Sequence, residues 1–250
     1  MAEFDYIEKN LGDIREKINK AVLNRDNIDN NIYKNKKVRL MAVTKTVDAD
    51  RNNFAVSKGA DLIGENKVNE LLEKYDKLNK DGLEIHFIGN LQTNKVKYII
   101  DKVNMIQSVN SIKLAEEINK RANQKNIVMD ILVELNIGAE DSKIGLAPEN
   151  AAEFMNLLKD FKNIRVMGLM TIPPAEASYN ANAGENFKIK KYFREMYKIF
   201  VDIAEKKIDN INMEILSMGM SEDYEEAVLC GSGMVRVGRA IFGERTYDIR

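Results

Sequence analysis

The chain has 250 residues, of which 44% are hydrophobic and 31% are charged, a mixture typical of soluble globular proteins. Its formal net charge is -1, so no basic excess favours nucleic acid or an anionic membrane as the partner. The single cysteine, Cys230, excludes an internal disulfide framework and fits a reducing cytoplasm. We see no signal peptide and no apolar run of the ~20 residues that a membrane helix needs, and therefore expect a cytoplasmic protein.

Strand and helix patterns alternate along almost the whole chain. An amphipathic helix is predicted first, at about 4–24, with apolar residues at helical spacing. Apolar runs then predict strands at 38–43, 61–64, 84–88, 105–109, 128–136, 165–171, 214–217 and 234–237. Charged amphipathic segments predict helices at 48–58, 66–78, 93–101, 111–124, 147–158, 187–207 and 221–230.

This order of elements predicts the fold. Eight strands alternating with helices indicate an α/β protein with a single (β/α)8 TIM barrel, preceded by an extra N-terminal helix. The length fits, since such barrels typically need about 250 residues. An open doubly wound sheet is the alternative. We assign residues 1–250 to one domain, with the barrel at about 38–243.

Lys45 is the first candidate functional residue, because it stands at the end of the first predicted strand. Side chains alternate along a strand, so Lys45 shares a face with Met41 and Val43. A lysine on an apolar face is costly without a partner, and a desolvated amine is the nucleophile that Schiff-base chemistry needs. The alternative is a surface lysine that extends its amine into solvent.

The loops after strands seven and eight form a second candidate region. In barrels of this type these loops commonly bind phosphate. Ser217, Gly219 and Ser221 offer hydroxyls and backbone amides ahead of a helix, and Gly238 and Arg239 open another helix. The sequence therefore predicts an anion site where these two loops meet.

Arg236 alternates with Met234 on the eighth strand and is predicted to point into the barrel. An alternative role is an ion pair with a buried carboxylate such as Glu134 or Glu214. A lysine and an arginine that point inward, opposite a phosphate-binding loop, indicate a ligand with both an aldehyde and a phosphate group. Pyridoxal 5'-phosphate (PLP) is such a ligand.

The remaining reactive residues have simpler interpretations. His86, the single histidine, is expected to be a hydrogen-bonded core residue rather than a base, and Cys230 a small buried hydrophobe. No cluster of cysteine and histidine has metal-ligand spacing, and no P-loop or G-x-G-x-x-G motif is present. The polar segment 175–185 is long enough to be a functional loop.

Short motifs in a fixed order also carry a family resemblance. They lie at 42–46, 64–66, 69–70, 86–89, 91–95, 136–137, 143–145, 168–173, 216–221 and 235–243. Together they resemble the YggS/PROSC family of pyridoxal phosphate homeostasis proteins, over about 38–243. The resemblance implies a barrel like the N-terminal domain of alanine racemase.

The resemblance also implies a site. It implies that PLP is held as an internal aldimine on Lys45, with Arg236 beside the pyridine ring and the phosphate on Ser217 and the following loop. Arg239 stands where the family shows a small hydroxyl residue, which leaves its backbone amide as the expected donor. The implied cofactor-binding residues are Lys45, Asn66, Ser217, Met218, Arg236, Gly238 and Arg239.

Whether such a site turns over a substrate depends on a proton-transfer group opposite the lysine. In the racemases that this chain resembles, a tyrosine from a second domain has this role. We expect no second domain in this chain, because the sequence ends soon after Gly243. Arginine beside the ring nitrogen cannot give up a proton to it. We therefore expect a non-catalytic, monomeric PLP carrier in vitamin B6 homeostasis, with PLP-dependent apo-enzymes as its partners.

Two other functions stay open. The first is a PLP-dependent amino-acid racemase or decarboxylase in which Tyr179, on the long polar loop, completes the site. The second is a barrel that binds an ordinary sugar phosphate without a covalent bond. Lys143 is a candidate for a second amine that exchanges with Lys45, and the alternative for it is a surface lysine.

Overall fold

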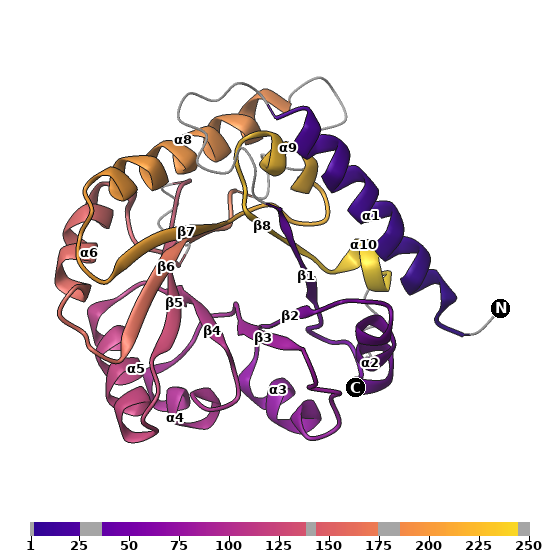
Figure 1. The fold of residues 1–250 in the computed structure, drawn as a ribbon, viewed down its shortest axis with the longest axis horizontal. Coiled ribbons are helices and arrows are strands. Elements are labelled where there is room, and N and C mark those ends of the chain that lie inside the picture. The colour runs from indigo at the N-terminus through magenta and orange to yellow at the C-terminus, as the bar shows by residue number, and fades with distance from the viewer. Residues whose placement is uncertain (1–2, 26–36, 139–143, 175–185, 245–250) are drawn as a thin grey trace.

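The computed structural model describes residues 3–25, 37–138, 144–174 and 186–244. Eight parallel strands close into a barrel in which each strand pairs with its neighbours in chain order (Figure 1). The predicted barrel is therefore confirmed, and the open sheet is excluded. The strands are β1 (Arg39–Val43), β2 (Leu62–Glu65), β3 (Glu84–Phe87), β4 (Met105–Val109), β5 (Met129–Leu135), β6 (Ile164–Thr171), β7 (Ile211–Ser217) and β8 (Met234–Val237).

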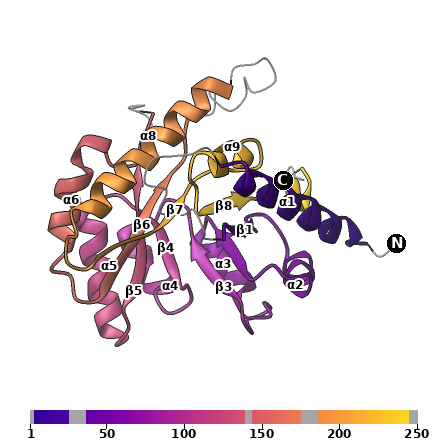
Figure 2. The same ribbon diagram turned by 45° about the horizontal axis from the view of Figure 1, so that its top comes forward.

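Helices surround the ring of strands, as Figures 1 and 2 show. None of the helices in the described part of the chain is long and apolar enough to cross a membrane. The α-helices are α1 (Asp5–Leu23), α2 (Ala49–Ser57), α3 (Val68–Tyr75), α4 (Val96–Ile99), α5 (Ile112–Gln124), α6 (Ala151–Leu158), α8 (Asn186–Glu205), α9 (Tyr224–Leu229) and α10 (Arg239–Phe242). Two 3-10 turns, η1 (Thr93–Lys95) and η2 (Pro148–Asn150), lead into α4 and α6.

Most predicted boundaries lie within a few residues of the observed ones. Among the larger differences, the helix predicted at 66–78 ends at Tyr75, and the one predicted from 147 begins with η2 and becomes α-helical only at Ala151. The helix expected at 221–230 begins only at Tyr224, because Asp223 accepts a hydrogen bond from the N–H of Met220 at 2.6 Å and closes a turn ahead of it. Strand β7 begins three residues earlier than expected, at Ile211, although its first residues are only half-buried. The assignment of residues 1–250 to one domain stays a prediction.

Helix α1 is the extra element of the fold. Its buried residues recur at helical spacing, and this stripe packs against the outside of the barrel beside α9 and α10 (Figure 1). Asn10 strengthens the contact, since its Nδ2 donates to the carbonyl of Ile241 at 3.0 Å. Helix α1 therefore covers the helices that follow the last two strands. The stripe consists of Ile7, Leu11, Ile14, Ile18 and Ala21.

The barrel interior combines apolar and polar side chains. Two small apolar clusters lie inside it, one around Met41 and Met234 and one around Met105 and Leu132, while the main core lies between strands and helices. Strand β6 contains an irregularity that only glycine accepts: Gly168 has φ 145°, and a Cβ there would lie 1.9 Å from the carbonyl oxygen of Ile215. The interior is thus a packed core, with its polar side chains described below.

Candidate functional site

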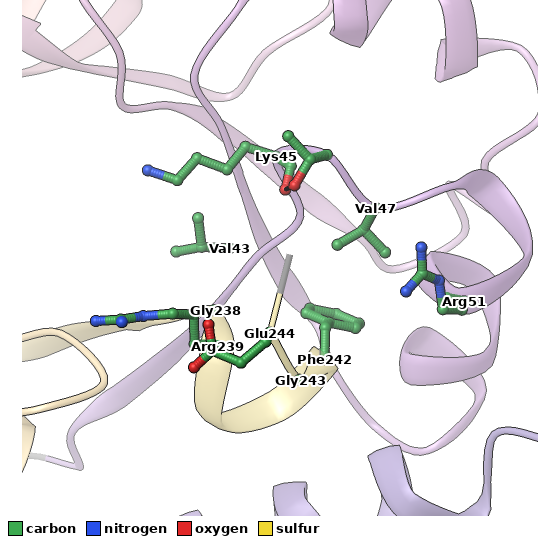
Figure 3. Close-up of a pocket in the computed structure, with 10 residues that line it drawn as sticks. Val43, Lys45, Val47, Arg51, Gly238, Arg239, Phe242, Gly243 and Glu244 are labelled. Carbon is green, nitrogen blue, oxygen red and sulfur yellow. Dashed lines mark hydrogen bonds between the residues drawn. The ribbon is translucent and has the colours of Figure 1, made fainter. Parts of the chain in front are cut away.

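The carboxyl ends of β1 and β8 bring the two predicted site regions together. Strands β1 and β8 pair directly, with Met41 opposite Arg236 and Ala42 opposite Val237. The residues that follow each strand therefore meet at one rim of the barrel, around a hollow shown in Figure 3. This hollow is lined by Val43, Lys45, Thr46, Val47, Arg51, Gly238, Arg239, Phe242, Gly243 and Glu244.

Lys45 is half-buried in the turn just beyond β1. Its side chain and that of Arg239 extend toward the same side of the hollow with Val43 between them, and Arg51 lies on the opposite side (Figure 3). The predicted strand therefore stops short of Lys45, and Thr46, the next residue, adopts a left-handed conformation with φ 63° within the turn. The amine is therefore carried by a tight turn and borders an apolar side chain.

A buried ion pair lies against this turn and was not predicted. Lys74 Nζ is 2.6 Å from Glu65 Oε1, and it also donates to the carbonyls of Thr44 and Val47 at 2.8 and 3.2 Å. Burial raises the pKa of Glu65, while Lys74 opposes that shift. The sequence carried a signal for Lys74, because it continues the buried stripe of α3 formed by Val68 and Leu71.

Arg236 points into the barrel, as predicted. It is buried, and its guanidinium donates from Nη1 to Ser217 Oγ and from Nη2 to the carbonyl of Thr171, both at 2.8 Å. Its hydrogen bonds go to a hydroxyl and a carbonyl rather than to the carboxylate of Glu134 or Glu214, so the suggested ion pair is absent among the described residues. Burial lowers the pKa of Arg236 to about 10.

Glu134 is nevertheless electrostatically linked to Arg236. This β5 residue is buried, whereas Glu214 is exposed. Burial raises the pKa of Glu134 to about 7, and the positive charge of Arg236 opposes the shift. The site therefore contains a carboxyl that changes its charge near neutral pH.

Ser217 and Met218 occupy different surroundings. The Ser217 hydroxyl is fully buried, donates to Gln107 Oε1 at 2.8 Å and accepts from Arg236. Met218 packs in the core outside the barrel; its N–H donates to Met234 and its carbonyl accepts from Ser232. Protein groups thus already engage both residues, and their roles as ligand contacts stay predictions.

Ser221 holds the start of α10. Its Oγ accepts from the N–H groups of Gly238 and Ala240 at 3.3 and 3.4 Å, longer than ordinary hydrogen bonds. The guanidinium of Arg239 is directed to Glu222, with 3.0 Å between Nη2 and Oε1. The backbone donors at this rim are therefore weakly bound, whereas the Arg239 side chain has a partner.

Asn66 lies at the end of β2 and presents an unsatisfied acceptor. Its Oδ1 is buried and has no hydrogen-bond partner within the described ranges. A buried acceptor without a donor is costly, so a polar ligand that supplied one would be stabilised here. Gly89 lies directly behind Asn66, since a Cβ at that position would lie 2.0 Å from the Asn66 carbonyl oxygen.

The other candidates are placed as follows. His86 is buried and hydrogen-bonded to Gln107 and Glu84, which confirms it as a core residue, and Cys230 is buried as expected. Within the described ranges no three histidine, cysteine or carboxylate side chains gather as metal ligands. Lys143, Tyr179 and the segment 175–185 lie outside the described residues.

Comparison with known proteins identifies the family. The family model of the alanine racemase N-terminal domain matches residues 23–246. A pyridoxal phosphate homeostasis protein from Aquifex aeolicus is 42% identical over 209 residues, which cover 84% of this chain and 88% of that protein. The chain belongs to the pyridoxal phosphate homeostasis protein family. A second member, from Haemophilus influenzae, is 33% identical over 97% of both chains.

Solved structures match this family member over nearly its full length. A protein from Bifidobacterium adolescentis has a TM-score of 0.83 and 30% identity, and covers 96% of both chains. PipY from Synechococcus elongatus, solved with PLP bound, has a TM-score of 0.77 at 24% identity, over 95% of this chain and 100% of its own. An alanine racemase from Clostridium difficile shares the fold at a TM-score of 0.66 and 17% identity, but this chain covers only 58% of it.

Proposed function

We propose that this chain binds PLP in vitamin B6 homeostasis and holds it rather than turning over a substrate. The observation that carries the proposal is the meeting of Lys45 with the backbone donors of Gly238 and Arg239 at one rim of the barrel. Relatives at 33% to 42% identity are named pyridoxal phosphate homeostasis proteins, which supports the same role here. The structurally similar PipY has been solved with PLP bound.

The residues present fit PLP. When bound, PLP supplies an aldehyde that an amine captures reversibly with loss of water, and Lys45 is the amine at the rim. The N–H groups of Gly238 and Arg239 suit a phosphate because they are backbone donors where α10 begins. The Ser221 hydroxyl, which accepts weakly from Gly238, still has its own proton to donate. The unsatisfied Oδ1 of Asn66 provides an acceptor for a polar group on the ligand.

Arg236 favours holding over turnover. A guanidinium donates hydrogen bonds but does not exchange its proton near neutral pH, so it orients a ring nitrogen without protonating it. The ring is then a weaker acceptor of electrons than it is beside a carboxylic acid. Ser217 and the carbonyl of Thr171 keep this guanidinium in place.

Glu134 supports one enzymatic alternative. A carboxyl with a pKa of about 7 meets the requirement of a general acid or base, which an amino-acid racemase or decarboxylase would need. We regard this as the second candidate function. Incubation of the PLP-loaded protein with a panel of amino acids distinguishes the two, because the carrier leaves the panel unchanged.

Partners and assembly follow from the same proposal. Reversible capture at Lys45 suits delivery of PLP to dependent apo-enzymes, and the protein acts as a monomer in the cytoplasm. Mixing the loaded protein with a PLP-dependent apo-enzyme and following recovery of its activity tests delivery. Light scattering during gel filtration tests the monomer.

The visible absorbance of the full chain with added PLP tests the central proposal. We expect a band from the covalent complex in the parent and none in Lys45→Ala. Lys58→Ala is the control, because Lys58 lies at the end of α2 and pairs with Glu8 at 2.8 Å. A band that persists in Lys45→Ala overturns the role of Lys45, and no band in any protein overturns PLP capture.

A further inference from the structure

A chain of hydrogen bonds begins at Arg236 and continues through the barrel interior. Arg236 Nη1 donates to Ser217 Oγ at 2.8 Å, and Ser217 Oγ lies 2.8 Å from Gln107 Oε1. Since the serine oxygen already accepts from the guanidinium, its own proton is directed to Gln107. All three side chains are buried, so water does not replace these contacts.

The chain continues from Gln107 to the opposite end of the barrel. Gln107 Nε2 lies 2.9 Å from His86 Nδ1, and His86 Nε2 lies 3.3 Å from Glu84 Oε2. Glu84 is held in turn by Arg39, whose Nη1 and Nη2 lie 3.1 and 2.9 Å from its two oxygens. Four side chains, from β8, β7, β4 and β3, thus connect the candidate site to the Glu84 carboxylate near the amino ends of the strands.

The two ends fix the direction of every bond between them. His86 and Arg39 lower the pKa of Glu84 to about 2, so at neutral pH this carboxylate only accepts. His86 must therefore carry its proton on Nε2, and its bare Nδ1 accepts from the Gln107 amide nitrogen. At the other end Arg236 only donates. One tautomer of His86 and one orientation of the Gln107 amide satisfy all of these groups.

The charges around His86 come from three strands. Glu84 of β3 and Asp130 of β5 favour a second proton on the imidazole, whereas Arg39 of β1 opposes it. Asp130 is itself paired with Arg165 of β6, at 2.6 Å. Burial outweighs these charges and lowers the pKa of His86, so the ring is neutral at pH 7.

A second proton on His86 would disturb the whole chain. Nδ1–H would then face the Gln107 amide nitrogen, and two donors would oppose each other. The amide would have to rotate and present its nitrogen to Ser217. The serine oxygen would face donors from Gln107 and Arg236 together, and its own proton would lose its acceptor.

We propose that Gln107 is a positioning residue, which holds Arg236 in the candidate site through Ser217. Gln107 can do so only while it donates to His86 Nδ1, which requires the neutral, Nε2-protonated form of His86. The proposal rests on the proposed function in one respect, since PLP is the ligand that Arg236 is positioned to meet. The arrangement of protons on His86 and Gln107 does not depend on any ligand.

Nuclear magnetic resonance on the full chain with 15N-labelled histidine tests the arrangement directly. The sequence has a single histidine, so its two ring nitrogens give one unambiguous pair of signals. At pH 7 and without ligand, we expect a protonated Nε2 and a bare Nδ1. In Gln107→Glu the added carboxylate accepts from Nδ1, so the midpoint of His86 protonation should rise. A protonated Nδ1 in the parent, or an unchanged midpoint in Gln107→Glu, overturns the proposal.

PLP titration tests the effect on the site. Gln107→Met keeps the length of the side chain and removes its hydrogen bonds to Ser217 and His86, together with the 3.2 Å contact of Nε2 to Met234 Sδ. We expect about tenfold weaker PLP binding, equivalent to about 1.4 kcal/mol. Gln107→Glu keeps the acceptor for Ser217, so at pH 8 it should lose less PLP affinity than Gln107→Met. Ser108→Ala is the control, because the neighbouring Ser108 Oγ is buried on the same strand and has no hydrogen-bond partner in the described structure.

The outcomes separate the two proposals. If the parent binds PLP and Gln107→Met binds it equally well, the positioning role is overturned while the proposed function stands. An equal loss in Ser108→Ala also overturns that role, since any disturbance of β4 would then suffice. If the parent binds no PLP, the proposed function fails and the positioning role fails with it.

Discussion

Lys74 and Glu65 form an ion pair that is buried against the turn carrying Lys45. Lys74 is 8% exposed and Glu65 is fully buried, with 2.6 Å between Nζ and Oε1. The same ammonium donates to the carbonyls on either side of Lys45, those of Thr44 and Val47. The conformation of the turn therefore depends on a charge pair contributed by β2 and α3.

Substitution of Lys74 should destabilise the folded protein and loosen this turn. Lys74→Met leaves Glu65 buried without its partner, and we expect a loss of about 3 kcal/mol in the free energy of unfolding. Burial raises the pKa of Glu65, so without Lys74 the carboxyl favours its neutral form and the loss should grow from pH 5 to pH 8. Urea unfolding at the two pH values measures both effects.

Lys67→Met is the matched control for this prediction. Lys67, the residue just before α3, pairs with Glu70 at 2.9 Å, but its side chain is 71% exposed, so we expect a change below about 0.5 kcal/mol in the free energy of unfolding. The double variant Lys74→Met/Glu65→Leu should recover part of the loss, because the unpaired charge is gone. Equal losses in Lys67→Met and Lys74→Met would contradict the importance of the buried pair.

Glu134 should make stability depend on pH between about 4.5 and 7. Its pKa rises to about 7 on folding, so the folded protein binds more protons than the unfolded chain in this range and stability falls as pH rises. Glu134→Gln cannot ionise and escapes this loss. The stability of the variant relative to the parent should therefore be higher at pH 8 than at pH 5, measured by thermal unfolding in matched buffers. The same difference at both pH values would contradict a raised pKa.

Gly89 should tolerate no side chain, because it lies against the backbone of Asn66. A Cβ at position 89 would lie 2.0 Å from the Asn66 carbonyl oxygen, so Gly89→Ala must displace the loop after β2 or the one after β3. We expect a loss of about 1 to 3 kcal/mol in the free energy of unfolding, measured with urea. Gly12→Ala is the control. Gly12 lies in α1 with nothing within 4 Å of the added Cβ, so the variant should gain about 0.5 to 1 kcal/mol in the free energy of unfolding. A neutral Gly89→Ala would show that these loops move apart easily.

Arg239 should bind the phosphate of PLP through its backbone rather than its side chain. Its guanidinium is paired with Glu222 at 3.0 Å, so Arg239→Ala should change PLP affinity less than about twofold. Ser221→Ala removes the hydroxyl that orients the N–H groups of Gly238 and Ala240, and should weaken binding about fivefold, the effect of losing one hydrogen bond. Fluorescence titration with PLP measures both. A larger loss in Arg239→Ala than in Ser221→Ala would reverse this assignment.

The sequence by itself determined the barrel and the direction of some side chains. Hydrophobic periodicity is local, so eight apolar runs separated by amphipathic helices predicted the closed sheet. Alternation along a strand is also local, and it placed Arg236 inside the barrel before the structure did. The same pattern predicted Lys45 at the end of β1, but the strand ends at Val43 and Lys45 lies in the turn beyond it.

Only the tertiary structure decided which of these residues meet. Ser217 and Gln107 are hydrogen-bonded although 110 residues separate them, and Lys74 reaches Thr44 across 30 residues. Ser221, rather than Ser217, proved to face the backbone donors of α10. These contacts depend on the register and closure of eight strands, and no local pattern encodes the distance between side chains that barrel closure brings together.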